Sequence, residues 1–195
     1  MSDEPHLIMF AGPNGSGKSS LITSSKLDFE VDSIINPDNY AKNLTNISDE
    51  YERYSIAMTQ CALIREELLE KRITFGFETV ASREDKLDFV KKAIEYGYCF
   101  ELMFMNAGSP EKCYERIQMR VAKGGHDVPK DRVFSRYERT LTYLPQYIKL
   151  AKNAYVFDNS GNQPELVLEK SDGMIKVTDF GKTTEWASKY LREFF

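Results

Sequence analysis

Gly12-Pro13-Asn14-Gly15-Ser16-Gly17-Lys18-Ser19 is the stretch of this chain that decides its fold. It matches the phosphate-binding pattern G-x-x-x-x-G-K-[ST] at every position. The apolar run at 7–11 before it is typical of a buried parallel strand, and residues 18–25 after it are expected to form a helix. A strand, a glycine-rich turn and a helix in this order predict a loop that binds the phosphates of a nucleoside triphosphate.

The residue types of this loop each have a physical reason. Glycines let the backbone approach closely enough for its N–H groups to point at phosphate oxygens. Lys18, which we expect to be exposed, would reach the β- and γ-phosphates, and the Ser19 hydroxyl would complete the shell of a Mg²⁺ ion. The residues predicted to hold the nucleotide are Gly12, Pro13, Asn14, Gly15, Ser16, Gly17, Lys18, Ser19 and Ser20.

Length and composition are those of an ordinary globular chain. The 195 residues are expected to form a single domain, 1–195, and 42% of them are hydrophobic and 29% charged. No apolar run is long enough to span a membrane, and the acidic start Met1-Ser2-Asp3-Glu4 argues against a secretory signal. The formal net charge of −4 argues against attraction to nucleic acid or to an anionic membrane.

The three cysteines, Cys61, Cys99 and Cys113, are scattered along the chain. Their odd number and the absence of metal-ligand spacing between them indicate reduced, buried thiols rather than disulfides or a cysteine-based metal site. Reduced cysteines are usual in proteins that work inside the cell, so the expected localisation is cytoplasmic.

Apolar periodicity alternates between strand and helix along most of the chain. Strands are expected at 31–35, 74–80, 99–105 and 154–157, and helices at 49–72, 82–96, 110–123 and 130–151. Ser82 is expected to cap its helix, Gly97 to end it, and Pro145 to kink the last one. This order predicts an α/β fold, a three-layer P-loop NTPase or kinase fold with a mainly parallel, doubly wound sheet.

The pattern changes in the last thirty residues, 165–195. Two alternating runs flank Ser171-Asp172-Gly173, which is a strong signal for a β-hairpin. A single amphipathic helix is expected over 183–195, with Trp186 and Phe195 among its core residues. We expect the hairpin to lie at an edge of the sheet or to pack as an appendage.

Polar residues follow the predicted strands, where ligands gather in open α/β sheets. Asp38 lies in the turn-forming cluster 36–39, Glu78 closes the third strand, and Asn106 and Asp158-Asn159 follow the next two. Asp38 could accept a proton from an attacking hydroxyl, help to hold Mg²⁺, or serve only as a turn residue. Glu78 ends a buried strand, so its charge requires a partner.

Two basic helices flank the glycine-containing loop 124–129 and suit a lid over residues 110–140. The first carries Lys112, Arg116, Arg120 and Lys123, and the second carries Arg132, Arg136 and Arg139. Arginines supplied by a lid stabilise the charge of a transferring phosphoryl group, although a solvated basic face has the same pattern. His126 has no second metal ligand at a useful spacing, so we expect it to shape the lid or to contact phosphate.

Several of these segments together resemble the zeta toxin family, in particular its short stand-alone members. The resemblance covers about 6–161, and the stretch Gly124-Gly125-His126-Asp127-Val128-Pro129 is its most specific part. The other segments that carry it are the phosphate loop, Asn36-Pro37-Asp38, Phe77-Glu78-Thr79 with Ser82, Arg136-Tyr137-Glu138-Arg139 and Phe157-Asp158-Asn159-Ser160.

The resemblance implies an ATP-dependent kinase that uses Mg²⁺. In the characterised toxins the phosphate goes to a hydroxyl of UDP-N-acetylglucosamine, and a small antitoxin protein is an expected partner. By motif position, the catalytic residues would be Asp38 as the base, Lys18, Arg120 and Arg136. The substrate would be held by Glu78, Thr79, Arg116 and His126, and Asn159 would join the nucleotide site.

The chain departs from the toxins in ways that leave alternatives open. It is shorter and ends in the predicted hairpin and helix, so its acceptor is not specified by the resemblance. Arg116, Arg120, Arg132 and Arg136 compete for the role of the catalytic lid arginine. A nucleotide-operated ATPase switch and an ATP-binding module without turnover are the alternative functions. Against the switch, the chain has no Leu-Ser-Gly-Gly signature and no apolar strand that ends in an Asp-Glu pair.

Overall fold

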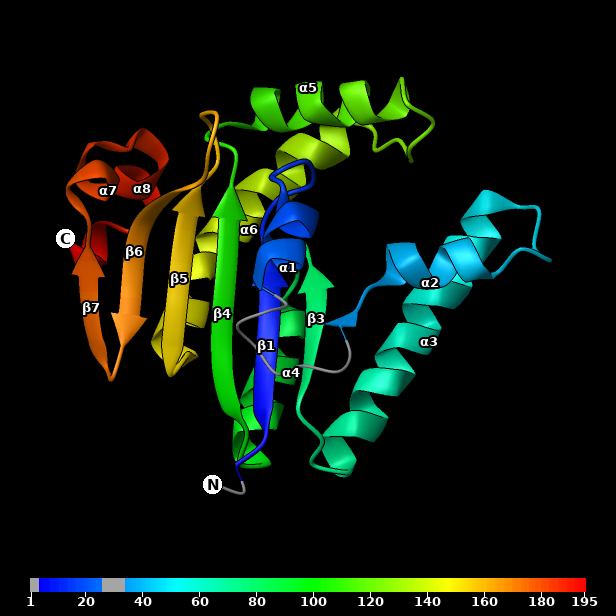
Figure 1. The fold of residues 1–195 in the computed structure, drawn as a ribbon, viewed down its shortest axis with the longest axis horizontal. Helices are drawn as coiled ribbons and strands as arrows, with labels where there is room; N and C mark the ends of the chain where they lie inside the picture. Colours follow the sequence, from blue (N-terminus) through cyan, green and yellow to red (C-terminus); the bar gives the residue numbers. More distant parts are fainter. Residues whose placement is uncertain (1–3, 26–33) are drawn as a thin grey trace.

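The computed structural model describes residues 4–25 and 34–195, which form a mixed α/β fold around one sheet. The strands are β1 (His6–Ala11), β2 (Ile34–Ile35), β3 (Phe75–Thr79), β4 (Cys99–Asn106), β5 (Asn153–Asp158), β6 (Glu165–Ser171) and β7 (Met174–Val177). Their order is β2-β3-β1-β4-β5-β6-β7 (Figure 1). Strands β2, β3, β1, β4 and β5 run parallel, and β6 and β7 are antiparallel.

The expected doubly wound, mainly parallel sheet is therefore confirmed. Of the strand predicted at 31–35, only Ile34 and Ile35 lie within the described residues, and both are in β2. The carboxyl ends of the parallel strands lie at one end of the sheet, and α5 lies across this end in Figure 1. The four β–α connections, which follow β1, β2, β3 and β4, and the loop after β5 therefore open on the same side of the molecule.

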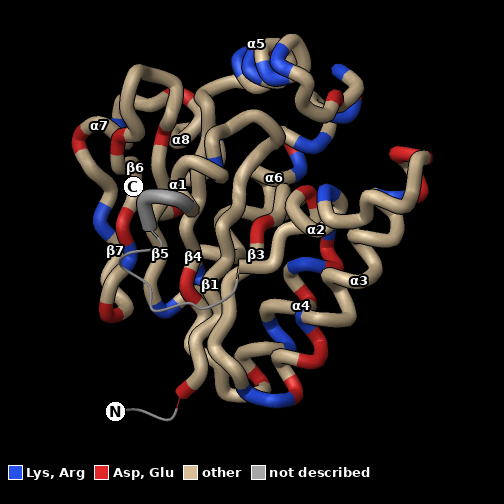
Figure 2. Tube along the Cα trace, turned by 45° about the vertical axis from the view of Figure 1, so that its right-hand side comes forward, with Lys and Arg blue, Asp and Glu red and all other residues tan. Residues whose placement is uncertain are grey.

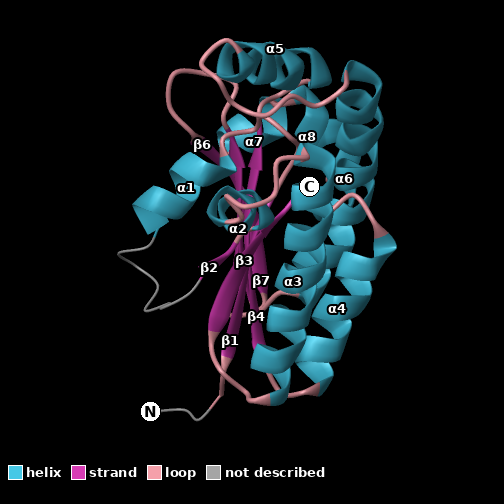
Figure 3. Ribbon diagram, turned by 90° about the vertical axis from the view of Figure 1, so that its right-hand side faces the viewer, coloured by secondary structure: helices cyan, strands magenta, loops and turns pink. Residues whose placement is uncertain are grey.

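Helices cover both faces of the sheet. They are α1 (Lys18–Ser25), α2 (Pro37–Asn43), α3 (Glu50–Glu70), α4 (Glu84–Glu95), α5 (Pro110–Val121), α6 (Lys130–Leu150), α7 (Asp179–Thr183) and α8 (Glu185–Tyr190), followed by the 3₁₀ turn η1 (Arg192–Phe194). Seen edge-on, α3, α4, α6 and α8 lie on one face and α1 on the other (Figure 3). Across the described ranges, no helix combines the length and apolarity needed to cross a bilayer.

The pleat of β1 divides the interior into two cores. Leu7 and Met9 point into the larger core, which packs against the four helices of one face. Ile8 and Phe10 point into the smaller core, where Leu21 and other apolar residues of α1 cover them. Because β1 is buried on both faces, the strand that leads into the phosphate loop is held firmly from both sides.

Two helix starts differ from the sequence-based expectation. The cluster 36–39 begins α2 rather than a free turn, because Asn36 caps the helix and accepts hydrogen bonds from the backbone N–H groups of Asp38 and Asn39. Proline is well suited to the first helical position, where no N–H is needed. Ser82 does not cap α4, which begins at Glu84. The chain first turns at Ala81, whose φ is 56°, so the helix starts later than predicted.

The C-terminal hairpin is confirmed, and it extends the sheet at its edge. Asp172 and Gly173 at its tip have φ values of 50° and 76°, which match the tight turns that join twisted strands. The single helix expected over 183–195 is wrong, because the extended backbone of Thr184 precedes α8, and α8 ends at Tyr190, after which the 3₁₀ turn η1 follows. Phe195, expected in the core, is 49% exposed.

Trp186 connects this C-terminal region to the carboxyl end of β5. Its indole N–H donates to Asp158 Oδ2 at 2.6 Å, and both side chains are buried. The other oxygen of Asp158 accepts from the backbone N–H of Ser160 at 2.7 Å. Asp158 is therefore used to hold the loop after β5, and the C-terminal helices depend on it.

We predict that Trp186→Phe lowers the free energy of unfolding by about 2–3 kcal/mol, because it leaves a buried carboxylate oxygen without a donor. Urea unfolding followed by circular dichroism measures this, since Trp186 is the chain's only tryptophan. Phe195→Leu, on an exposed side chain, is the control and should change stability by less than about 0.5 kcal/mol. Equal free energies of unfolding in the two variants would show that the indole hydrogen bond does not stabilise the fold.

Candidate functional site

The glycine-rich loop between β1 and α1 has the backbone that its sequence predicts. Gly12, Gly15 and Gly17 all have positive φ, at 146°, 78° and 103°. A side chain is also excluded by space, since a Cβ on Gly12 would lie 2.1 Å from the Met105 carbonyl oxygen. At Gly15 the corresponding distance to the Cys113 carbonyl oxygen is 2.3 Å. Only glycine satisfies both the conformation and the close packing at these positions.

Lys18 lies inside this loop rather than in solvent. The expectation of an exposed side chain is wrong, because Lys18 is 7% exposed and its ammonium group donates to the carbonyl oxygens of Gly12 and Pro13, each at 2.9 Å. Burial lowers the pKa of Lys18, and the nearby carboxylate of Glu78, at 3.9 Å, partly opposes that shift. A buried ammonium held by neutral carbonyls is well placed to exchange them for an anion.

The loop therefore fits a polyphosphate on its own features. Besides Lys18 and the positive-φ glycines, it holds the Ser16 hydroxyl, which is buried and has no hydrogen-bond partner within the described part of the chain. Ser19 and Ser20 follow on the first turn of α1, where their residues are exposed. Ser19 is the residue in position to offer a hydroxyl to a phosphate-bound Mg²⁺.

Glu78 and Asp38 bring two carboxyl groups to the same crevice. Glu78 Oε2 accepts a hydrogen bond from Asn36 Nδ2 at 2.5 Å, and only 14% of the Glu78 side chain is exposed. Burial raises the pKa of Glu78, Lys18 lowers it, and Asp38 raises it further. Asp38 is exposed at the start of α2, and its charge raises the pKa of both Glu78 and Lys18, so it lies near them, while its role in the site stays a prediction.

Asn36 is a site residue that the sequence reasoning did not identify. Its side chain caps α2 through Oδ1 and holds Glu78 through Nδ2, so one residue fixes the Glu78 carboxylate and the backbone that carries Asp38. The sequence signal was an asparagine before a proline, which favours a helix start as much as a turn. The choice between the two depended on the neighbouring strand, which supplies Glu78.

Other predicted polar residues serve the structure rather than the crevice. Asn159 Nδ2 donates to the Ser16 carbonyl oxygen at 2.9 Å, so this side chain supports the phosphate loop from behind. Asn106 is buried and donates to the Tyr137 hydroxyl at 3.1 Å. The expectation that Asn106 and Asp158 line the crevice is wrong, because both side chains are buried, at 0% and 2% exposed. Asp158 is paired with Trp186, whereas Asn106 Oδ1 has no hydrogen-bond partner among the described residues.

Basic side chains of α5 and α6 face the loop from the opposite side. Arg116 donates to the Asn159 carbonyl oxygen at 2.7 Å, and its Nη1 is buried without a partner among the described residues. Arg120 donates to the His126 carbonyl oxygen at 2.7 Å. Arg136 reaches Asn14 Oδ1 at 3.5 Å, and burial lowers its pKa. Figure 2 shows how Lys and Arg gather on α5 above the sheet.

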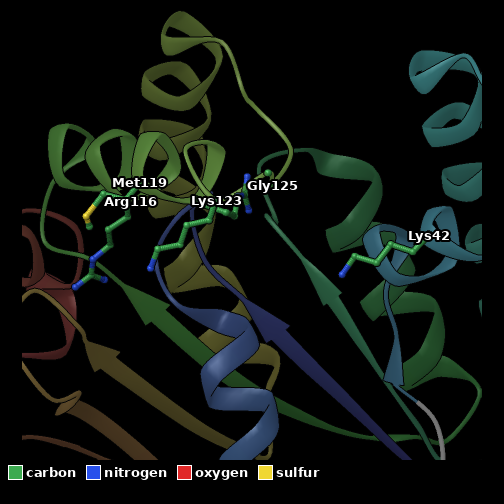
Figure 4. A pocket seen from close by; sticks show the side chains of 7 residues that line it. Lys42, Arg116, Met119, Lys123 and Gly125 are labelled. Atoms are coloured by element: carbon green, nitrogen blue, oxygen red, sulfur yellow. The ribbon is translucent and has the colours of Figure 1, made fainter.

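An open pocket of about 500 Å³ separates α5 from α2. Figure 4 shows Arg116 reaching down from α5 and Lys123 from the turn after it, with Lys42 extending toward them from α2. The residues that line it are Lys42, Arg116, Met119, Arg120, Lys123, Gly124 and Gly125. With four cations and no carboxylate in its lining, this pocket suits a ligand that carries negative charge.

His126 connects the loop 124–129 to the beginning of α3. Its Nδ1 lies 2.7 Å from Glu50 Oε1, and its ring lies 4.4 Å from the ring of Tyr54. The contact holds the segment that also accepts the Arg120 hydrogen bond. His126 therefore shapes this loop, one of the two roles expected for it. Thr79, by contrast, uses its hydroxyl to accept from the Ala81 N–H at 3.1 Å.

Comparison with protein families gives a match to the AAA domain over residues 7–144, which is more than half of the chain. The chain belongs to the AAA domain family. An uncharacterized protein of Haemophilus influenzae is 30% identical to this AAA domain over 135 residues, which are 67% of this chain and 91% of that protein. The residues matched to the family, 7–144, include the phosphate loop, Asp38, Glu78 and the arginines of α5 and α6.

Solved structures share the fold at low sequence identity. AvrRxo1-ORF1:AvrRxo1-ORF2 with sulphate ions gives a TM-score of 0.76 and 18% identity, covering 98% of this chain and 64% of that one. The same pair with ATP gives a TM-score of 0.75 and 17% identity, with the same coverage. This AAA domain thus spans about two thirds of the AvrRxo1 chain.

A third structure comes from the PezAT chromosomal toxin–antitoxin system of Streptococcus pneumoniae. Its TM-score is 0.65 at 15% identity, and the match covers all of this chain and 89% of that one. The chain therefore shares the P-loop fold, with its mainly parallel sheet, that the resemblance to the zeta toxin family predicts.

We predict that Glu50→Ala loosens the loop that His126 holds. Trypsin should then cleave after the exposed Lys123 roughly two- to fivefold faster, because an exposed ion pair is worth little and its loss shifts the open population by that factor. Mass spectrometry of fragments 1–123 and 124–195 measures the rate. Glu52→Ala, two residues further along the same helix, should cleave like the parent protein, and equal rates in both variants would contradict the contact.

Proposed function

We propose that this AAA domain is an ATP-dependent kinase that transfers the γ-phosphate of Mg-ATP to a hydroxyl group of a small acceptor. One observation carries the proposal: Lys18 lies 3.9 Å from Glu78, whose partner Asn36 begins the helix that carries Asp38, and Arg136 of α6 lies 3.5 Å from Asn14 of the phosphate loop. A phosphate loop alone would serve a switch or a binding module equally well. Carboxyl groups beside it add the means to activate an acceptor.

Each part of the site would then have a role in the transfer. Lys18 would leave the carbonyl oxygens of Gly12 and Pro13 and bind the β- and γ-phosphates. Bound Mg²⁺ would neutralise phosphate charge, with the Ser19 hydroxyl among its ligands. Arg136 would stabilise the transferring group from above, because its hydrogen bond to Asn14 Oδ1, at 3.5 Å, is long and easily replaced.

Asp38 and Glu78 suit different tasks. Asp38 is exposed, so it could reach an incoming hydroxyl and accept its proton as the oxygen attacks phosphorus. Glu78 is held by Asn36 and lies close to Lys18, which favours a role in positioning the acceptor. Thr79, Arg116 and His126 already have structural partners, so we assign them at most a secondary part in substrate binding.

The basic pocket supports an acceptor that is itself anionic. Lys42, Arg120 and Lys123 offer positive charge well beyond the phosphate loop. A sugar nucleotide such as UDP-N-acetylglucosamine has both the hydroxyl and the diphosphate that this arrangement would recognise. The 110–140 region would act as the lid, within a single domain that works in the cytoplasm. A small antitoxin protein is a proposed partner, on the model of the PezAT system.

The test is a product assay with a panel of nucleotide sugars and other hydroxyl-bearing phosphates. Incubation with Mg-ATP should give one species heavier by a phosphoryl group, detected by mass spectrometry. Release of inorganic phosphate without such a product would support an ATPase switch. ATP binding without any turnover would support a binding module, and either result would overturn the kinase assignment.

Asp38→Asn separates the roles that remain open for this residue. As the base, its loss should reduce acceptor phosphorylation by about 10²- to 10⁴-fold while Mg-ATP affinity persists. If Asp38 is a metal ligand, the substitution should instead weaken Mg-ATP binding, and extra Mg²⁺ should partly restore it. If Asp38 only begins α2, Mg-ATP affinity and acceptor phosphorylation should both stay near the parent values, which would refute the assignment. Asp179→Asn, on the exposed start of α7, is the matched control.

A further inference from the structure

Three potential metal ligands meet at the end of the sheet opposite the phosphate loop. They are His6 on β1 and Cys99 and Glu101 on β4. His6 and Cys99 are register partners in the parallel pair β1–β4, and Glu101 follows two residues later on the same face of its strand. In Figure 1 this is the lower end of both strands, beside the N-terminus. Two adjacent, fully paired strands thus place all three side chains.

The three ligand atoms are close enough to bind one ion. All of them lie within 4.8 Å of one another, and His6 Nδ1 is 2.7 Å from Glu101 Oε1. A tetrahedral zinc ion with bonds of about 2.0–2.3 Å holds its ligands roughly 3.3–3.8 Å apart. Side-chain rotations that move the ligand atoms by about 1 Å would therefore bring the cluster to metal-binding distances without moving the strands.

Burial gives these groups a reason to bind a cation. Cys99 is 3% exposed and Glu101 is 8% exposed, and a carboxylate so deeply buried requires a compensating charge. Among the described residues, His6 is its hydrogen-bond partner.

The surrounding charges also permit a divalent ion. Glu4 and Lys152 form an ion pair at 3.4 Å near Cys99, so the lysine charge is already matched. A divalent metal with one thiolate, one carboxylate and a neutral imidazole gives a site of zero net charge. Binding would release the thiol proton, together with any proton carried by His6.

We propose that His6, Cys99 and Glu101 form a zinc-binding site, with a fourth position open to water on the exposed side of His6. Sulfur, nitrogen and a single carboxylate together favour zinc, whereas Mg²⁺ and Ca²⁺ require oxygen ligands. The site lies on β1, whose other end continues into the phosphate loop. A bound ion would fasten β1 to β4, so its role is structural and independent of phosphate transfer.

Co²⁺ is the probe for this site, because a thiolate ligand gives it a charge-transfer absorption band that zinc lacks. The full chain, without nucleotide, should bind one equivalent of Co²⁺ with this band, and Zn²⁺ should abolish the band by displacement. Cys99→Ala should remove it. Cys61→Ala, which removes another buried thiol far from the cluster, should keep it.

His6→Gln provides a second variant in case Cys99→Ala does not fold. The His6 side chain is 39% exposed, so its replacement leaves the core intact, as far-UV circular dichroism can verify. Loss of a direct ligand should weaken Co²⁺ binding by more than about 100-fold. Absence of stoichiometric binding, or unchanged binding in His6→Gln and a band that survives Cys99→Ala, would overturn the proposal.

Discussion

The buried ammonium group of Lys18 is the feature on which the rest of the site depends. It is enclosed by two carbonyl oxygens of its own loop and lies 3.9 Å from Glu78, so it keeps its charge only by partial compensation. Such a cation is stabilised most by an anion that offers several oxygens at once. The glycines give the loop its shape, and β1, buried on both faces, holds that loop in place.

Supports for this loop come from distant parts of the chain. Asn159 holds the Ser16 carbonyl oxygen, and Arg116 holds the Asn159 carbonyl oxygen in turn. Asp158, one residue earlier, binds Trp186 of the C-terminal region. The hairpin and the helices after it are therefore connected to the nucleotide site through two consecutive residues. Their contribution is to keep the loop after β5 in position, which gives them a structural reason to be present.

Periodicity and motif chemistry predicted the sheet, the phosphate loop and the hairpin, because local patterns determine these features. Long-range contacts were beyond that reasoning. Nothing local shows that Asn36 would reach Glu78, or that His6 would meet Glu101 across two strands. Arg65 is the plainest example: it occupies a core position on α3, where its guanidinium lies 5.4 Å from the centre of the Phe77 ring. From the sequence, a charged residue on a helix is predicted to lie at the surface, but in the structure Arg65 is buried.

In the proposed kinase, the Lys18 ammonium group binds the phosphates of Mg-ATP. Titration calorimetry of Lys18→Met tests it most directly, because methionine keeps most of the buried volume and removes only the charge. Mg-ATP affinity should fall by roughly 10- to 100-fold, the contribution of charged hydrogen bonds. Lys71→Met, on the exposed end of α3, should bind like the parent protein. Unchanged affinity in Lys18→Met, in a protein that remains folded, would contradict the account.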